Sequence, residues 1–203
     1  MTAGIVEFLK IFIPLFVVID PFGAMLIFMG LTSGMNHGET RVVTMDAVIY
    51  GFIILLFFAL LGNYLLYFFG ITIQAIEIAG GAILLIMGIN MVREGDRPSS
   101  AGGNVEKDIG IVPMATPLLA GPGAISLVII LMNGGYYNLI FTIISLVLVF
   151  VIIFLFFEFS ERILSLMGAK VLKAMTRVLG LLVAGFAIQY ILDAISIIAT
   201  TLH

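Results

Sequence analysis

Long apolar stretches make up most of the chain, and short polar segments separate them. A helix that crosses a membrane needs about 20 mostly apolar residues. Six stretches are long enough, and they predict six transmembrane helices at residues 5–32, 42–69, 71–92, 109–132, 137–158 and 177–200. The connections after the second and fourth stretches are very short, which predicts two tight hairpins at Phe69-Gly70 and at Asn133-Gly134-Gly135.

One long polar segment divides the chain into two halves. Residues 93–108 are rich in glycine, serine and charge, which predicts a linker between residues 1–92 and residues 109–203. Each half contains three predicted spans. Because three is odd, the second half must enter the membrane in the opposite orientation. The predicted fold is therefore an all-α integral membrane protein built from two inverted three-helix repeats, a plan used by many secondary transporters.

The two halves resemble each other in sequence. Asp20-Pro21-Phe22-Gly23-Ala24 in the first span matches Gly121-Pro122-Gly123-Ala124-Ile125 in the fourth span. Asn90 in the third span has a counterpart in Gln189 of the sixth span. Apolar helices also resemble one another by composition alone, but the coincidence of proline and amide positions favours a repeat.

Both matching segments carry residues that end one helix and start another. A proline inside a helix removes a backbone donor and collides with the preceding turn. Asp is a favoured N-cap residue, and Pro is favoured at the first helical position. Asp20-Pro21 and Gly121-Pro122 therefore predict that the first and fourth spans break near mid-membrane and restart as half-helices. Simple kinks in packed helices are the alternative interpretation.

The two predicted breaks differ in charge. Asp20 can cap its own half-helix, whereas Gly121 leaves the N–H groups of residues 123–125 for an incoming anion. A carboxylate at Gly121 and an ammonium group at Asp20 together describe the head of a zwitterionic amino acid. An ionised Asp at mid-membrane costs about 2.5–3.5 kcal/mol, so Asp20 is also expected to bind a coupling ion, either a proton or sodium.

The candidate binding residues lie at the two breaks and at polar positions near them. Asn90 and Gln189 either line the substrate path or form interhelical hydrogen bonds. Thr116 and Ser126 flank the second break, where they either contact substrate or stabilise the freed carbonyl groups. The full set comprises Asp20, Pro21, Phe22, Gly23, Asn90, Thr116, Gly121, Pro122, Gly123, Ala124, Ile125, Ser126 and Gln189.

Composition supports a membrane protein and excludes several classes. The chain is 62% hydrophobic and 10% charged, with a mean hydropathy of +1.27, well outside the range of soluble domains. A net charge of -3 argues against nucleic-acid binding. The chain has no cysteine, which excludes disulfides and thiolate metal sites. The predicted spans carry no mid-depth Arg or His and no paired carboxylates, so we expect no catalytic residue, no metal and no cofactor.

The placement of basic residues predicts the orientation in the membrane. Eight of the nine Lys and Arg residues fall on one side of the six predicted spans, and only Lys10 falls on the other. The positive-inside rule then makes loops 33–41, 93–108 and 159–176 cytoplasmic and both termini external. Residues 159–176 mix apolar and basic side chains, which fits either a short helix at the membrane surface or a solvated turn.

Taken together, the quoted motifs resemble the MarC family of membrane proteins, which includes SnatA-type neutral amino acid transporters. The resemblance covers essentially the whole chain. It rests on Ile19-Asp20-Pro21-Phe22-Gly23 and, above all, on residues 113–126, PMATPLLAGPGAIS. The segment Arg177-Val178-Leu179-Gly180 and Gln189 are also similar to the family. Phe22 and Ala24 differ from the residues common in the family, which leaves fine selectivity open.

The resemblance implies six spans in the cell (inner) membrane and transport of small neutral amino acids such as glycine or alanine, coupled to a cation gradient. This agrees with the zwitterion argument made from the residues. An intramembrane enzyme acting on a lipid, a passive channel and a structural membrane subunit are the alternatives. We expect a small zwitterionic substrate, a proton or sodium ion and the lipid bilayer as partners. The amino acid, the coupling ion, the direction of transport and whether the protein forms a homo-oligomer stay open.

Overall fold

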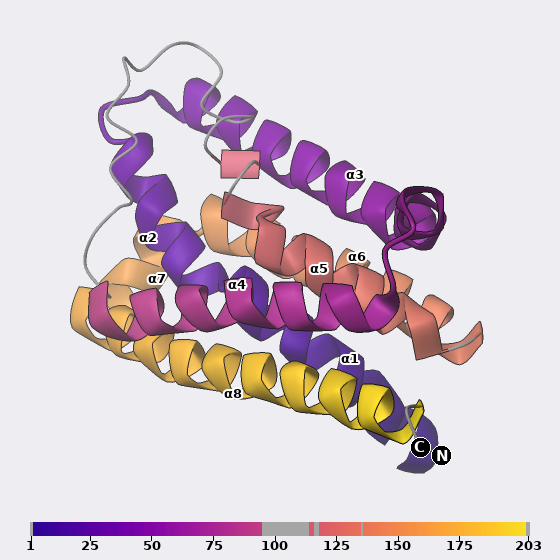
Figure 1. Cartoon of the computed structure of the whole chain (residues 1–203). Helices are drawn as coiled ribbons and strands as arrows, with labels where there is room; N and C mark the ends of the chain where they lie inside the picture. Colours follow the sequence, from indigo (N-terminus) through magenta and orange to yellow (C-terminus); the bar gives the residue numbers. More distant parts are fainter. Residues whose placement is uncertain (1, 95–113, 116–117, 135, 202–203) are drawn as a thin grey trace.

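The computed structural model describes residues 2–94, 114–115, 118–134 and 136–201, and this described part is all helical, without strands. Figure 1 shows the helices packed into one bundle. They are α1 (Thr2–Ile19), α2 (Pro21–Leu31), α3 (His37–Phe69), α4 (Ile73–Glu94), α5 (Pro122–Leu131), η2 (Met132–Gly134), α6 (Tyr136–Glu158), α7 (Ser160–Met167) and α8 (Ala169–Thr201). The predicted all-α class is confirmed.

Five stretches of the described helices are long and apolar enough to cross a membrane. They are Gly4–Leu31, His37–Phe69, Ile73–Arg93, Asn138–Glu158 and Ala169–Thr200. These correspond to five of the six predicted spans. At the fourth predicted span the structure describes the shorter apolar helix α5 and some of the residues before it, with residues 109–113 and 116–117 outside the described part. The six-span inverted repeat therefore stays a prediction.

The helix α3 begins earlier than its apolar stretch indicated. The helix α3 begins at His37, five residues before the predicted 42, because Asn36 and Glu39 form a capping box. The Glu39 N–H donates to Asn36 Oδ1 at 3.0 Å, and the Asn36 N–H donates to Glu39 Oε2 at 2.9 Å. A polar first turn can thus be helical although it adds nothing to a hydropathy count.

The segment 159–176, predicted as a loop, is mostly helical. It forms the short helix α7 (Ser160–Met167), and α8 already begins at Ala169 rather than at the predicted 177. Gly168 separates the two helices with φ 76°, a left-handed conformation that favours glycine. Of the two alternatives for this segment, the short helix is the one present.

The helices α4 and α8 form the most extensive pair and lie side by side in Figure 1. Their backbones approach closely where both carry glycine. A β-carbon built on Gly88 would lie 2.6 Å from the carbonyl oxygen of Gly180, and one on Gly180 would lie 2.9 Å from that of Gly88. Small residues allow this approach, as is usual between membrane helices.

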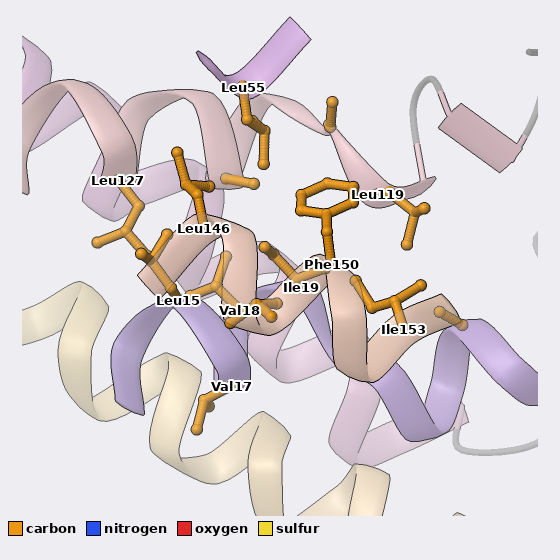
Figure 2. Close-up of a cluster of buried hydrophobic side chains, with 14 of the residues drawn as sticks. Leu15, Val17, Val18, Ile19, Leu55, Leu119, Leu127, Leu146, Phe150 and Ile153 are labelled. Atoms are coloured by element: carbon orange, nitrogen blue, oxygen red, sulfur yellow. The ribbon is translucent and has the colours of Figure 1, made fainter. Parts of the chain in front are cut away.

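The interior of the bundle is filled by apolar side chains around α1 and α2. Figure 2 shows residues such as Leu15, Leu127, Leu146 and Phe150 meeting between α1, α5 and α6. Large apolar side chains also cover the outside of the bundle, for example Phe57 of α3 and Leu181 of α8. A bundle that is apolar inside and outside is suited to lipid as its solvent.

Candidate functional site

The first predicted interruption is present at Asp20. The helix α1 ends at Ile19 and α2 begins at Pro21, so a single residue separates them. Asp20 has φ 47° and ψ 74°, and it is the one non-glycine residue of the described chain with positive φ. Asp is among the few side chains that tolerate this conformation. Its N–H donates to the Phe16 carbonyl at 3.1 Å, and its carbonyl accepts from the Ala24 N–H at 2.9 Å.

The Asp20 side chain lies inside the protein. It is only 6% exposed, and its Oδ1 has no hydrogen-bond partner among the described residues. The carboxylate turns toward the first turn of α2, where Gly23 leaves it room, since a β-carbon on Gly23 would collide with Asp20 Oδ2. Asp20 occupies the N-cap position, as predicted, but makes no side-chain cap hydrogen bond.

The second interruption is present at Gly121. Gly121 is extended, with φ -75° and ψ 167°, and it is the N-cap residue of α5, with Pro122 at the first helical position. Just before it, the Ala120 N–H donates to the Ala115 carbonyl five residues back, at 2.9 Å, which is the wider turn of a π-helix. The chain therefore restarts as the half-helix that the sequence predicted.

Two backbone donors of this half-helix are without an intrahelical acceptor. Pro122 has no N–H, and the N–H groups of Gly123 and Ala124 belong to the first turn, where no preceding helical carbonyl is available. The Ile125 N–H, by contrast, donates to the Gly121 carbonyl at 2.9 Å. The prediction that residues 123–125 all offer free amides is thus wrong for Ile125, because the first full helical hydrogen bond already uses it.

A cavity of about 350 Å³ opens beside the start of α5. Its volume falls within the range of small-molecule sites. The lining is mostly apolar, and its polar parts are the side chain of Asn90 and the backbone at the N-terminus of α5. The lining residues are Val18, Ile83, Ile86, Met87, Asn90, Met91, Leu118, Gly121, Pro122, Gly123 and Ala124.

Close packing against α4 fixes the position of the half-helix. A β-carbon on Gly123 would lie 2.8 Å from Leu84 Cδ2, and one on Gly80 would lie 2.6 Å from Ser126 Cβ. Ser126 is 9% exposed and does not line the cavity. Its observed contact is therefore with the packed face of α4, whereas the two roles predicted for it, substrate contact and stabilisation of the freed carbonyl groups, stay predictions.

Five of the predicted site residues come together at the cavity. They are Asn90, Gly121, Pro122, Gly123 and Ala124. Ile125 and Ser126 follow them on α5 without lining it. Thr116 lies outside the described residues.

The remaining predicted residues lie elsewhere. Asp20, Pro21, Phe22 and Gly23 form the first break, which does not line the cavity, although Val18, two residues before Asp20, does. The Phe22 ring packs edge-on against Phe156 of α6, with centroids 5.1 Å apart. Gln189 is exposed on α8, where its Nε2 donates to Asp193 Oδ1 at 2.8 Å, so the structure does not bring it to the cavity.

Sequence reasoning missed two kinds of site residue. Ile83, Ile86 and Met87 line the cavity from α4, but nothing distinguishes them from other apolar residues of that helix. Thr176 of α8 comes close to the first break, because a β-carbon on Gly23 would lie 3.4 Å from Thr176 Cγ2. Only the helical packing reveals either contact.

The fold and the site define a multi-pass helical integral membrane protein with a small cavity at the end of a half-helix. Residues 5–199 match the MarC family, described as MarC family integral membrane proteins. The chain belongs to this family.

Relatives of the chain carry general membrane-protein names. The chain is 34% identical to a UPF0056 membrane protein of Methanocaldococcus jannaschii, over 93% of this chain and 95% of the relative. It is 30% identical to one of Aquifex aeolicus, over 94% and 92% of the two chains, and 31% identical to YvbG of Bacillus subtilis, over 89% and 90%. No solved structure matches the chain.

Proposed function

We propose that this protein is a secondary transporter that moves small neutral amino acids across the cell membrane by alternating access. The observation that carries the proposal is the cavity beside the start of α5, which is lined both by Asn90 and by two residues, Gly123 and Ala124, whose N–H groups have no helical acceptor. The start of a helix carries partial positive charge and favours an anion. A substrate carboxylate fits this end.

The rest of the substrate fits the rest of the cavity. Asn90 offers an amide oxygen that can accept from an ammonium group, and an NH₂ group that can donate to a carboxylate. The lining side chains of Met87 and Ile83 are apolar, which suits a hydrogen or methyl side chain as in glycine or alanine. Asp20 does not line the cavity, so we assign it to the coupling cation rather than to the substrate ammonium.

The packing of the two breaks is compatible with inverted repeats. The first break packs against α8, through Gly23 and Thr176, and the second packs against α4, through Gly123 and Leu84. The helices α4 and α8 also pack against each other. Such a crossed arrangement is what a pseudo-two-fold relation between the halves would produce, and rocking of one half against the other would expose the cavity alternately to each side.

The proposal places the protein in the cell (inner) membrane with both termini external and the loops rich in Lys and Arg in the cytoplasm. The proposed transport involves no catalytic step, because the groups assigned to the substrate are backbone N–H groups and an amide side chain, which bind it without reacting. A lipid-acting enzyme would convert its substrate, whereas the transporter releases it unchanged.

Counterflow in proteoliposomes tests the proposal. Vesicles loaded with unlabelled alanine should accumulate external labelled glycine or alanine above its equilibrium level, and protein-free vesicles should not. A passive channel would only equilibrate the label. Absence of exchange with glycine, alanine and serine, under imposed proton and sodium gradients, would refute the proposal.

A further inference from the structure

We propose that the Asp20 carboxylate, the Thr176 hydroxyl and the carbonyl end of α1 form a sodium-binding site that is separate from the cavity at α5. The inference rests on the proposed function, because it identifies the cation that the transporter uses. It adds a second residue, Thr176, and a second helix, α8, to what the sequence indicated for Asp20.

The Asp20 carboxylate is buried and forms no ion pair with another described residue. It is 6% exposed, and its Oδ1 has no hydrogen-bond partner in that part of the chain. A carboxylate in this position inside a membrane helix is costly unless a cation or a proton joins it. Asp20 therefore provides one negative charge with an oxygen atom left over for a ligand.

The Thr176 hydroxyl differs from those of Thr32 and Thr44 and resembles that of Thr142, the fourth buried threonine of the described chain. A threonine in a helix often donates to the carbonyl four residues earlier. Thr32 and Thr44 do so here, with distances of 2.8 Å to Phe28 and 3.0 Å to Thr40. Thr176 is 7% exposed, yet its Oγ1 has no partner among the described residues. A second buried oxygen is thus left for a ligand.

These two side chains converge on one point. A β-carbon on Gly23 would collide with Asp20 Oδ2 and would lie 3.4 Å from Thr176 Cγ2. The small volume left by Gly23 therefore lies between the carboxylate and the methyl group of Thr176, and the Thr176 hydroxyl lies near the same carboxylate. The side chains come from the broken first span and from α8, so a bound ion would join elements distant in sequence.

The end of α1 supplies further oxygen atoms. The Val17 carbonyl would accept from residue 21 in a continuous helix, but Pro21 has no N–H. The backbone hydrogen bonds at the break run from Asp20 to Phe16 and from Ala24 to Asp20, and none reaches the carbonyls of Val18 or Ile19. Unwound carbonyls at the ends of broken helices are a common sodium ligand in transporters.

The chemistry of these ligands favours sodium. Carboxylate, hydroxyl and carbonyl oxygens are hard donors, which suit hard cations. One carboxylate balances a monovalent ion. Lys173 and Arg177, which neighbour Thr176 in sequence, line a surface hollow together with Lys170 and Ala174.

The experiment measures equilibrium binding of radioactive sodium to the purified full-length protein in lipid nanodiscs, with choline replacing sodium in the buffer. We expect saturable binding that unlabelled sodium displaces and choline does not. Thr176→Val removes the hydroxyl with little change in shape, and Asp20→Asn removes the charge. Each should weaken binding about tenfold or more.

Thr142→Val is the matched control. Thr142 is fully buried on α6 with an unpartnered hydroxyl, like Thr176. It lies 14 residues before Phe156, the α6 residue that contacts Phe22, so it is about 21 Å away along the helix. Sodium binding to this variant should equal that of the wild type. If Thr176→Val does not fold, Thr176→Ala and the hydroxyl-retaining Thr176→Ser replace it, and Ser should bind within about threefold of wild type.

Three results would overturn the inference. They are no saturable sodium binding to the wild-type protein, unchanged binding to folded Thr176 variants that lack the hydroxyl, and proton uptake at Asp20 in place of sodium. Counterflow of alanine in the same preparation separates this failure from that of the proposed function. Alanine exchange without sodium binding would refute only the sodium site. Sodium binding without alanine exchange would refute only the assignment of amino acids as the substrate.

Discussion

The carboxylate of Asp20 occupies the space that a side chain at position 23 would need, since a β-carbon on Gly23 would overlap Asp20 Oδ2. Gly23 has no unusual backbone angle, so its importance lies in this space. The contact explains why a small residue follows the break: it lets the carboxylate fold over the first turn of α2.

Replacing Gly23 by Ala should therefore displace the carboxylate. We expect a loss of stability of about 1–3 kcal/mol from overpacking, together with loss of sodium binding and of cation-coupled exchange. Thermal unfolding and counterflow measure the two effects. Gly30→Ala in the same helix is the control, because nothing lies within 4 Å of its β-carbon. Full cation coupling in Gly23→Ala would contradict this account of the break.

Asn90 and Gln189 provide a direct comparison of two residues that the sequence treats as equivalents. Both are exposed, but Asn90 lines the cavity, whereas Gln189 does not and donates to Asp193. Asn90→Ala should raise the half-saturation concentration for alanine exchange about tenfold, because a hydrogen-bonding group in the cavity is lost. Gln189→Ala should change it less than about threefold. An equal effect of both variants in counterflow would contradict the proposed site.

The contact between Gly88 and Gly180 predicts a packing defect. A β-carbon on Gly88 would lie 2.6 Å from the Gly180 carbonyl oxygen and 2.8 Å from the Ala184 nitrogen, and backbone atoms cannot move aside easily. We expect Gly88→Ala to lower the free energy of unfolding by about 1–3 kcal/mol. Gly185→Ala on α8 has nothing within 4 Å and should keep wild-type stability or improve it. Equal melting temperatures for the two variants would exclude close packing of α4 and α8.

The absence of cysteine makes the orientation testable by labelling single-cysteine variants. Tyr67 near the end of α3 is 89% exposed, and Leu166 of α7 is 85% exposed. In intact cells, a membrane-impermeant maleimide should label Tyr67→Cys, whereas Leu166→Cys should react only after permeabilisation. The reverse pattern would invert the proposed topology, and labelling of both from outside would exclude it.

The sequence was most informative where backbone chemistry decides the structure. Pro21 and Pro122 cannot donate a hydrogen bond and each follows a favourable N-cap residue, which together favour a helix break; a proline alone does not, since Pro14 lies inside the continuous helix α1. The positions of both breaks could therefore be predicted. The wider π turn at Ala120 could not, because it depends on how the preceding residues settle against the rest of the bundle.

The sequence did not reveal how each helix is rotated about its axis, and this rotation decides which side chains face the cavity. Asn90 and Gln189 occupy matching positions in the repeat, yet only Asn90 faces the cavity. The rotation depends on which faces pack, and glycines at 88 and 180 bring α4 and α8 together in one particular way. The position of Thr176 beside the first break could not be predicted for the same reason, since Asp20 and Gly23 lie more than 150 positions earlier in the chain.

Helix starts with polar residues were also underestimated. Asn36 caps the start of α3 through side-chain hydrogen bonds. The helix α8 starts at Ala169, directly after Gly168, which has positive φ. Neither signal contributes to hydropathy, although the capping residues are visible in the sequence. Capping rules would have placed the start of α3 correctly.

The central claim is that an amino acid occupies the cavity at the start of α5. Met87 lines this cavity, and Met87→Cys would carry the only thiol of the protein. The rate at which a small methanethiosulfonate reagent modifies this cysteine in proteoliposomes, with and without alanine, tests the claim. Alanine should slow the reaction severalfold in Met87→Cys and leave it unchanged in Met175→Cys, an exposed position on α8. Equal rates for Met87→Cys with and without alanine, in a preparation that exchanges alanine, would contradict the claim.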